Sequence, residues 1–324
     1  MGKWRHRWLG VSGISALALF TSACGSTSTS SASTSSTASS ASSSANGAKA
    51  TVVVGSKNFT EQLLFGNMTL DVLKAAGYPV KSDLGLGSTT IARNALLNGQ
   101  IGMYWEYTGT ALTSFFHVTS TISNPQKAYQ LVKADDAKNN LVWLNPTPLN
   151  DTYTIMMQKT QADKLGIHTL SDLASYVKAH PTALKFASDN EFAVRPDGIG
   201  GVEKKYGFTF PSSQVVVMNS GLIYQALKNN QAQVGVGFST NGSIKAFGLV
   251  NLVDNKHFFP VYNAAPVVRS SLLKSDPGIK PILNNLSAKL TTNAMIELSY
   301  QVDIQHKAVQ TVAHDWLVQQ GLLK

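Results

Sequence analysis

Residues 51–62 read TVVVGSKNFTEQ, a β-branched run that leads directly into the start of a helix. Valine runs favour strands because branched side chains pack well on a pleated surface. Asn58 and Glu61 have the spacing of a capping box, which predicts that both residues cap the following helix. Apolar residues then recur every fourth position and predict one buried helix stripe, at Leu64, Met68 and Val72. A strand followed by a helix is the building unit of α/β folds.

The same alternation of strand and helix continues along the rest of the chain. Thr169 and Asp172 form a second capping-box pattern, and long helices rich in Leu, Ala and Ile close the sequence. Further strands are predicted at 101–105, 141–144, 152–157, 184–187, 214–218 and 233–237. This order predicts a first lobe, residues 51–150 and 256–324, interrupted by a second lobe, residues 151–255. The two crossings between the lobes would act as a hinge.

An aromatic motif, YWEYTGT at residues 104–110, follows the strand predicted at 101–105. Ligands of α/β sheets bind beyond the carboxyl ends of strands, and aromatic faces attract quaternary ammonium cations. Lys57 in the upstream segment adds positive charge near a helix start. Together the two segments predict a site for a zwitterion, with rings for its cationic end. The alternative that Tyr104 and Trp105 are ordinary core residues remains open.

The N-terminal residues predict a secretory signal over residues 1–23. Lys3, Arg5 and Arg7 precede an apolar core that is shorter than the about 20 residues of a membrane-spanning helix. Cys24 follows and is the single cysteine, so it cannot form an internal disulfide. The arrangement resembles a bacterial lipoprotein signal, in which Cys24 receives lipid; a free cysteine after ordinary cleavage is the alternative. Residues 24–50 are rich in Ser and Thr and are expected to be a disordered linker.

Composition excludes several other classes of protein. The formal net charge is +9, of which Lys3, Arg5 and Arg7 contribute three, and the other basic residues are scattered, which argues against nucleic-acid binding. Neither a Cys/His cluster with metal-ligand spacing nor a phosphate-binding glycine loop occurs, so we expect no metal and no cofactor. The histidines have no spacing typical of a nucleophile–base pair, which argues against an enzyme.

Several motifs resemble, in order and over residues 51–324, those of the substrate-binding proteins of ABC importers for glycine betaine, choline and related osmoprotectants. The resemblance implies a two-lobed class II periplasmic-binding-protein fold with the ligand cleft between the lobes. It also implies a monomeric, non-enzymatic receptor that is anchored by lipid outside the cytoplasm and works with a permease and an ATPase. The motifs are GSKNFTEQ at 55–62, EYTGT at 106–110, Glu191-Phe192 with Arg195, Asp197 and Gly198, and STNG at 239–242.

The resemblance also implies roles for individual residues. An aromatic cage would contain Tyr107, Tyr153, Tyr262 and, in place of a fourth tyrosine, Phe238. The carboxylate end would contact Lys57, Thr110 and Arg195, and a bidentate guanidinium suits a carboxylate. Asp197 and Gly198 would shape their loop, and Glu61 would cap its helix.

The identity of the ligand stays open within this resemblance. A neutral Thr110 beside two cationic residues favours glycine betaine, carnitine or proline betaine over choline. A receptor for choline or an amino acid, an extracytoplasmic enzyme acting on choline-like compounds, and a purely structural surface lipoprotein are the alternatives.

Overall fold

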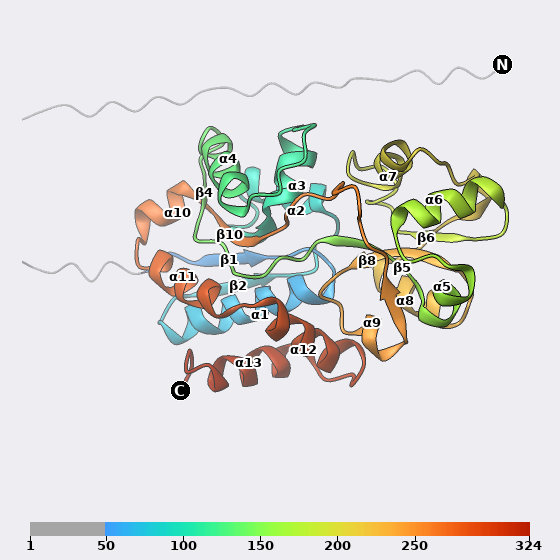
Figure 1. Cartoon of the computed structure of the whole chain (residues 1–324). Helices are drawn as coiled ribbons and strands as arrows, with labels where there is room; N and C mark the ends of the chain where they lie inside the picture. The colour runs from blue at the N-terminus through green and yellow to red at the C-terminus, as the bar shows by residue number, and fades with distance from the viewer. Residues whose placement is uncertain (1–48) are drawn as a thin grey trace, which may run out of the picture. The chain divides into compact units, whose positions relative to one another are not determined.

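The computed structural model describes residues 49–324 and contains two five-stranded sheets (Figure 1). The expected signal segment 1–23, Cys24 and the rest of the Ser/Thr-rich linker as far as residue 48 lie outside the described residues. Strands and helices alternate along most of the described chain, so the predicted α/β class is confirmed.

The first sheet contains β1 (Val52–Gly55), β2 (Val80–Asp83), β3 (Met103–Tyr107), β4 (Leu141–Trp143) and β10 (Ala264–Arg269). Its strand order is β2-β1-β3-β10-β4. Strand β1 is parallel to β2 and β3, whereas β10 is antiparallel to β3 and β4. Because β10 comes from the last quarter of the chain, the C-terminal segment returns to the sheet that the N-terminal segment began.

The second sheet contains β5 (Tyr153–Gln158), β6 (Phe186–Ser188), β7 (Val215–Val217), β8 (Val234–Phe238) and β9 (Leu249–Asn251). Its order, β7-β6-β8-β5-β9, repeats the pattern of the first sheet. Here β6 is parallel to β7 and β8, and β5 is antiparallel to β8 and β9. In each sheet, several parallel strands therefore end at the same edge, and the loops that follow them can carry a site.

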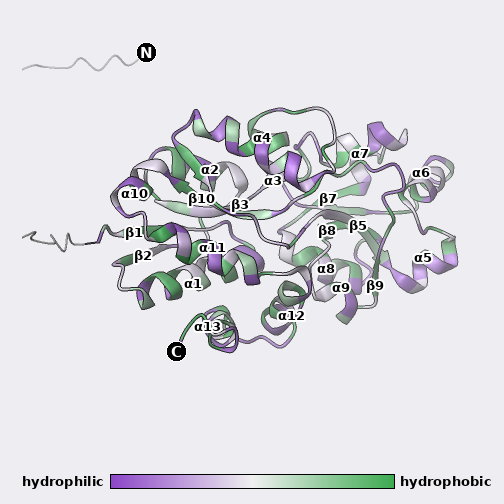
Figure 2. Ribbon diagram, turned by 60° about the vertical axis from the view of Figure 1, so that its left-hand side comes forward, coloured by the Kyte–Doolittle hydropathy of each residue, from purple (hydrophilic) through white to green (hydrophobic). Residues whose placement is uncertain are grey.

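Helices cover both faces of the first sheet (Figure 1). One face carries α1 (Thr60–Ala75) with α11 (Ile279–Lys289), α12 (Thr292–Asp303) and α13 (Val309–Gln319), all of which contact α1. The predicted stripe of α1 is buried: Leu64, Met68 and Val72 belong to the main apolar core. Figure 2 shows the matching alternation of apolar and polar residues along the helices. The remaining helices here are α2 (Thr89–Leu97), α3 (Thr108–Thr110), a π-helical turn Ala111–Phe115, α4 (Pro125–Ala137) and α10 (Ser270–Ser275).

Shorter helices surround the second sheet. Helix α6 begins with the predicted capping box, in which Thr169 and Asp172 bond each other's backbone N–H groups. The others end mostly at glycine or asparagine, as helices commonly do. These helices are α5 (Lys159–Leu165), α6 (Leu170–Ala179), α7 (Ile199–Tyr206), α8 (Ser220–Lys228) and α9 (Ser243–Ala246).

The two segments that connect the sheets lie side by side. Asn150 and Asn263 form an isolated antiparallel bridge, and the Tyr262 N–H donates to Asn150 Oδ1 at 2.7 Å. The Asn263 side chain donates to the Leu149 carbonyl at 2.9 Å. This pairing makes the crossing a double-stranded connection, which suits a hinge, and the lobe boundaries at 150 and 256 remain a prediction.

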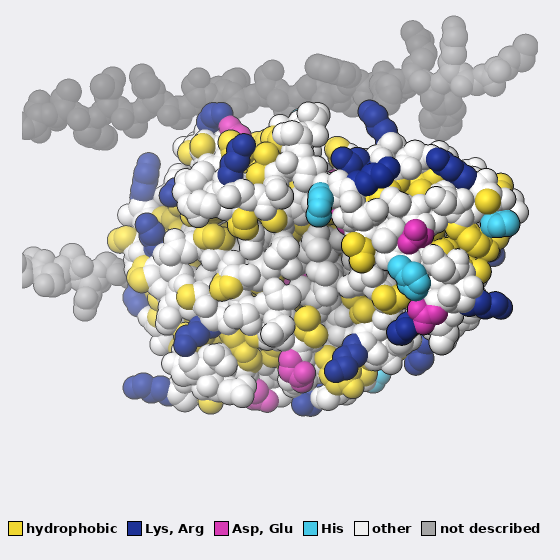
Figure 3. Space-filling view, viewed as in Figure 1, with side chains coloured by type: hydrophobic (Ala, Val, Ile, Leu, Met, Phe, Trp, Pro, Cys, Tyr) yellow, Lys and Arg dark blue, Asp and Glu magenta, His cyan; other side chains and the backbone are white. Residues whose placement is uncertain are grey.

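The distribution of basic side chains on the surface agrees with their scattered positions in the sequence. Lys and Arg side chains are dispersed over the face shown in Figure 3 and form no continuous basic stripe there. Among residues 49–324, no helix combines the length and the apolar character needed to cross a membrane.

Candidate functional site

Aromatic rings from five separate segments meet between the two sheets. Tyr153 opens β5 and lies 4.9 Å from the Phe238 ring at the end of β8 and 5.6 Å, edge to face, from Tyr262. Phe59, just before α1, stacks on Phe238 at 5.1 Å and lies 6.3 Å from Tyr107 at the end of β3. The four predicted cage residues therefore gather in one place. Phe59 is an additional ring, and no pattern in the sequence indicated that it would join the others.

Gly109 allows one of these rings to approach the aromatic motif. A Cβ atom at this position would lie 2.6 Å from the Tyr262 ring and 2.7 Å from the Val261 carbonyl oxygen. Both distances are shorter than van der Waals contact, so only glycine admits the ring here. The motif 104–110 is thus shaped to receive Tyr262. Trp105 is a core residue instead: it stacks on Phe65 at 4.6 Å, away from the other rings.

Lys57 is buried in an ion pair with a carboxylate of the aromatic motif. Its Nζ lies 2.6 Å from Glu106 Oε1 and 5.1 Å from the centre of the Tyr107 ring. Tyr104 donates its hydroxyl to the other Glu106 oxygen at 2.8 Å, and the Tyr107 N–H donates to Oε1 at 2.8 Å. Glu106 thus fixes Lys57 against Tyr107, a role that sequence spacing could not reveal because the partners are 49 residues apart.

Arg195 is held by two carboxylates. Its Nε and Nη2 donate to the two oxygens of Asp197, each at 2.8 Å, and Nη1 donates to Glu191 at 2.9 Å. Nη2 also lies 3.4 Å from Thr110 Oγ1, and the guanidinium carbon is 5.3 Å from the Tyr153 ring centre. Asp197 in turn accepts the Tyr262 hydroxyl. One buried network therefore orients the predicted cation, the predicted hydroxyl donor and two of the predicted cage rings.

Glu61 does not cap α1, so this part of the sequence prediction is wrong. The helix begins at Thr60 with Phe59 as its N-cap, and no side chain bonds to the free N–H groups there. Glu61 is therefore at the second helical position, one residue too early for a capping box. Its buried carboxylate accepts instead from the Tyr107 hydroxyl at 2.7 Å and from Thr240 at 3.2 Å.

A second carboxylate, Asp151, shares the Thr240 hydroxyl with Glu61. Burial, and then repulsion by Asp151, holds the pKa of Glu61 well above its ordinary value. Burial likewise raises the pKa of Asp151 from 3.8 to about 7, against the lowering effect of its hydrogen bonds with Thr240 and of the charge of Lys57. The pair therefore keeps at least one proton over much of the acidic range.

We expect Asp151 to contribute a fall in the free energy of unfolding as pH rises from 3.8 to about 7, because folded Asp151 holds its proton over that range and the unfolded residue does not. Asp151→Asn removes this contribution, so its stability should depend less on pH. Urea unfolding at a series of pH values measures the slope. Asp163→Asn, on the exposed face of α5, is the control and should leave the slope unchanged. An Asp151→Asn variant with the full slope would contradict the assignment.

Two cavities, each of about 310 Å³, open around the rings. Phe59 and Phe238 line both cavities, so their stacked rings form a common wall. The first cavity, which we call the cage cavity, is lined by Lys57, Tyr107, Thr110, Tyr153 and Glu191 among others. Arg195 and Tyr262 stand directly behind its lining, in contact with Tyr153.

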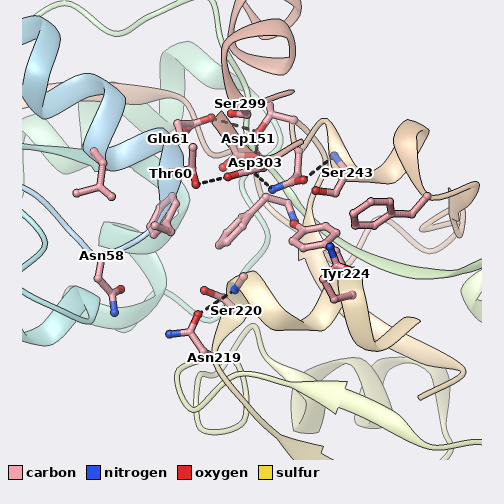
Figure 4. Close-up of a pocket in the computed structure, with 18 residues that line it drawn as sticks. Asn58, Thr60, Glu61, Asp151, Asn219, Ser220, Tyr224, Ser243, Ser299 and Asp303 are labelled. Carbon is pink, nitrogen blue, oxygen red and sulfur yellow. Dashed lines mark hydrogen bonds between the residues drawn. The ribbon is translucent and has the colours of Figure 1, made fainter. Parts of the chain in front are cut away.

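The second cavity, which we call the acidic cavity, lies on the other side of Phe59 and Phe238. Figure 4 shows the labelled carboxylates Glu61, Asp151 and Asp303 grouped together beside Ser299. Within residues 49–324 no cluster of three His, Cys, Asp or Glu side chains is arranged to hold a metal ion. The candidate site thus has two cavities that share the stacked rings of Phe59 and Phe238.

The fold and the rings define a class of two-lobed binding proteins, and comparison with known proteins gives the family. The family model for the substrate-binding domain of an ABC-type glycine betaine transport system matches residues 50–319. The chain belongs to this family of transport substrate-binding proteins.

Individual relatives agree with the family match. The chain is 40% identical over 278 residues to a glycine-betaine-binding protein of Pseudomonas aeruginosa, covering 84% of this chain and 89% of the relative. It is 33% identical to the glycine betaine-binding protein YehZ of Escherichia coli, covering 86% and 93%. A crystal structure described as a glycine betaine/carnitine/choline ABC transporter superposes with a TM-score of 0.67 at 31% identity, over 84% of this chain and 100% of the other.

Proposed function

We propose that this chain is the solute receptor of an ABC importer and binds glycine betaine or a related quaternary ammonium compound in the cage cavity. The observation that carries the proposal is the meeting of Tyr107, Tyr153, Phe238 and Tyr262 from four segments at one place between the sheets. In this proposal the two lobes close over the ligand and deliver it to a permease. The receptor carries out no covalent chemistry.

The rings suit a cation that has no N–H groups. Each aromatic face over a desolvated ammonium contributes about 2 kcal/mol, so three or four rings give a large favourable total before the costs of closure. A primary amine would lose its hydration in such a cage without gaining hydrogen bonds. The site should therefore prefer a trimethylammonium group to an amino acid's ammonium.

The carboxylate of a betaine would enter beside Thr110, Lys57 and Arg195. Thr110 lies 3.4 Å from Arg195, so one ligand oxygen can contact both side chains. Arg195 has five N–H donors, so its Nη atoms can donate a further hydrogen bond to a ligand while Asp197 keeps the guanidinium in place. This arrangement supports a zwitterion.

Choline is the second candidate, and one specific observation favours it. Both cations already have carboxylate partners: Lys57 pairs with Glu106, and Arg195 pairs with Asp197 and Glu191. Around Arg195 the formal charge is negative, which would favour a ligand that is a cation without an acid group.

Isothermal titration with glycine betaine, carnitine, choline and proline distinguishes these candidates. We expect binding of glycine betaine or carnitine, weaker binding of choline and none of proline. Choline as the tightest ligand would select the second candidate. Failure of all four to bind would reject the proposal.

The location and the partners follow from the same proposal. We propose that Cys24 carries lipid, that the mature receptor is monomeric and held outside the cytoplasm, and that residues 24–50 link it to the membrane. Metabolic labelling with a fatty acid should mark the full-length chain, and Cys24→Ser should abolish the label.

A further inference from the structure

The acidic cavity has a lining that the cage does not explain. Helix α1 contributes Glu61, the first crossing contributes Asp151, and the end of α12 contributes Asp303. The loop after β8 contributes Thr240 and Asn241. Elements from both sheets therefore meet around this space, as Figure 4 shows.

The charged residues of this lining are all acidic. Glu61, Asp151 and Asp303 line the cavity, and its lining contains no Lys, Arg or His. Asp303 accepts from Thr60 at 2.6 Å and from Asn241 at 3.3 Å. A carboxylate has about four lone-pair sites, so each of the three retains acceptor capacity toward a ligand.

Two buried serine hydroxyl groups give independent support for a ligand in this cavity. Ser243 and Ser299 are 4% and 3% exposed, and both line the cavity. Neither hydroxyl has a hydrogen-bond partner among the described residues, although comparable serines such as Ser175 bond their own helix. Because both residues line the cavity, a group bound there can supply the missing hydrogen-bond partner, and most polar groups of buried residues in native proteins have one.

A third hydroxyl group, that of Tyr224, accepts a hydrogen bond but donates none within residues 49–324. The Tyr224 hydroxyl accepts from the Phe238 N–H at 2.9 Å, and its own proton has no acceptor in the part of the chain that the structure describes. Tyr224 is 4% exposed and lines the same cavity. The cavity thus presents hydroxyl groups beside the carboxylates.

The walls between these polar groups are aromatic. Phe59, Phe238, Phe247 and Tyr224 line the cavity and offer apolar faces for methylene groups. A quaternary ammonium would feel the charge of the carboxylates, but it has no N–H donor and could not hydrogen-bond to the carboxylate and serine oxygens. A protonated primary or secondary amine on a short aliphatic chain matches both the acceptors and the apolar walls.

We propose that the acidic cavity is a second binding site, for the N–H-bearing ammonium group of a short aliphatic amine, separate from the quaternary ammonium cage. Its ammonium donates to Asp303 and to Glu61 or Asp151, and Ser243 and Ser299 complete the shell. The site goes beyond the proposed betaine function and does not depend on it. Because its lining comes from both sheets, an occupant bridges them.

Titration calorimetry with 1,4-diaminobutane, in the presence of saturating glycine betaine, tests the site. We expect binding of the diamine, and no binding of its fully N-methylated analogue. Asp303→Asn should weaken diamine binding by about tenfold or more, as expected for losing a charge-assisted hydrogen bond. Ser299→Ala is a second, smaller change that should weaken binding in the same direction while the protein stays folded.

Tyr262→Ala is the matched control, since this residue belongs to the cage and does not line the acidic cavity. It should weaken glycine betaine binding and leave the diamine affinity unchanged, so failure of one site is distinguished from failure of the other. No diamine binding at millimolar concentration, competition by glycine betaine, or equal binding of the methylated analogue would each overturn the proposal.

Discussion

Replacing Tyr153 with alanine should lower the affinity for glycine betaine by about 30-fold or more, the equivalent of about 2 kcal/mol for one desolvated ring. Tyr153 lies at the centre of the aromatic group, because its ring contacts Phe238, Tyr262 and Phe192 and faces the Arg195 guanidinium. Removing this ring therefore deletes one wall of the proposed cage and loosens the packing of two others, Phe238 and Tyr262. Isothermal titration of the purified variant measures the loss.

Two controls separate the cage from general damage. Tyr153→Phe keeps the ring and should retain most of the affinity. Tyr176→Ala removes a tyrosine of α6 that contacts His180, far from the site, and should not change binding. If Tyr153→Ala lost no more affinity than Tyr176→Ala, the cage assignment would be wrong.

Replacing Arg195 with methionine should destabilise the protein by about 3–5 kcal/mol, because it leaves the buried Asp197 carboxylate without its partner. The guanidinium is nearly inaccessible, and it bonds Asp197, Glu191 and the Thr113 hydroxyl. Urea unfolding monitored by tryptophan fluorescence measures the change. A loss below about 1 kcal/mol would place the pair among exposed ion pairs of little energetic effect.

The double variant Arg195→Met/Asp197→Asn separates stability from ligand binding. It removes both charges, so much of the lost stability should return, while Glu191 keeps the Thr89 N–H as a donor. Glycine betaine binding should remain weakened by about tenfold or more, because its carboxylate loses a charged partner. Choline binding should change little. Equal losses for both ligands would mean that Arg195 only positions Tyr153.

Local patterns predicted much of the fold. The run 51–55 contains β1 (Val52–Gly55), the α1 stripe at Leu64, Met68 and Val72 is buried, and Thr169 with Asp172 forms a capping box. These features depend on residues a few positions apart, which is the range that propensity and periodicity describe. Glu61 shows the limit of such patterns. The helix begins one residue later than the pattern predicted, so the Glu61 carboxylate does not cap it and accepts from the Tyr107 hydroxyl instead.

The structure brings the predicted site residues together, but the contacts that connect them were not predicted from the sequence. Tyr153, Phe238 and Tyr262 are brought together, but the sequence did not indicate that Phe59 stacks on Phe238. The partners of the two cations were also not predicted. Such pairs join residues far apart in the sequence, and the pairing of β1 with β3 brings Glu106 beside Lys57, which follows β1.

The most direct test of the aromatic cage is an NMR measurement of the bound ligand. Glycine betaine labelled with ¹³C on its N-methyl groups, bound to the full chain, should show intermolecular NOEs from those methyl protons to the rings of Tyr107, Tyr153 and Tyr262. Its methyl resonance should also move upfield through ring currents. Methyl protons that show no NOE to these rings, in a sample that binds the ligand, would contradict the account.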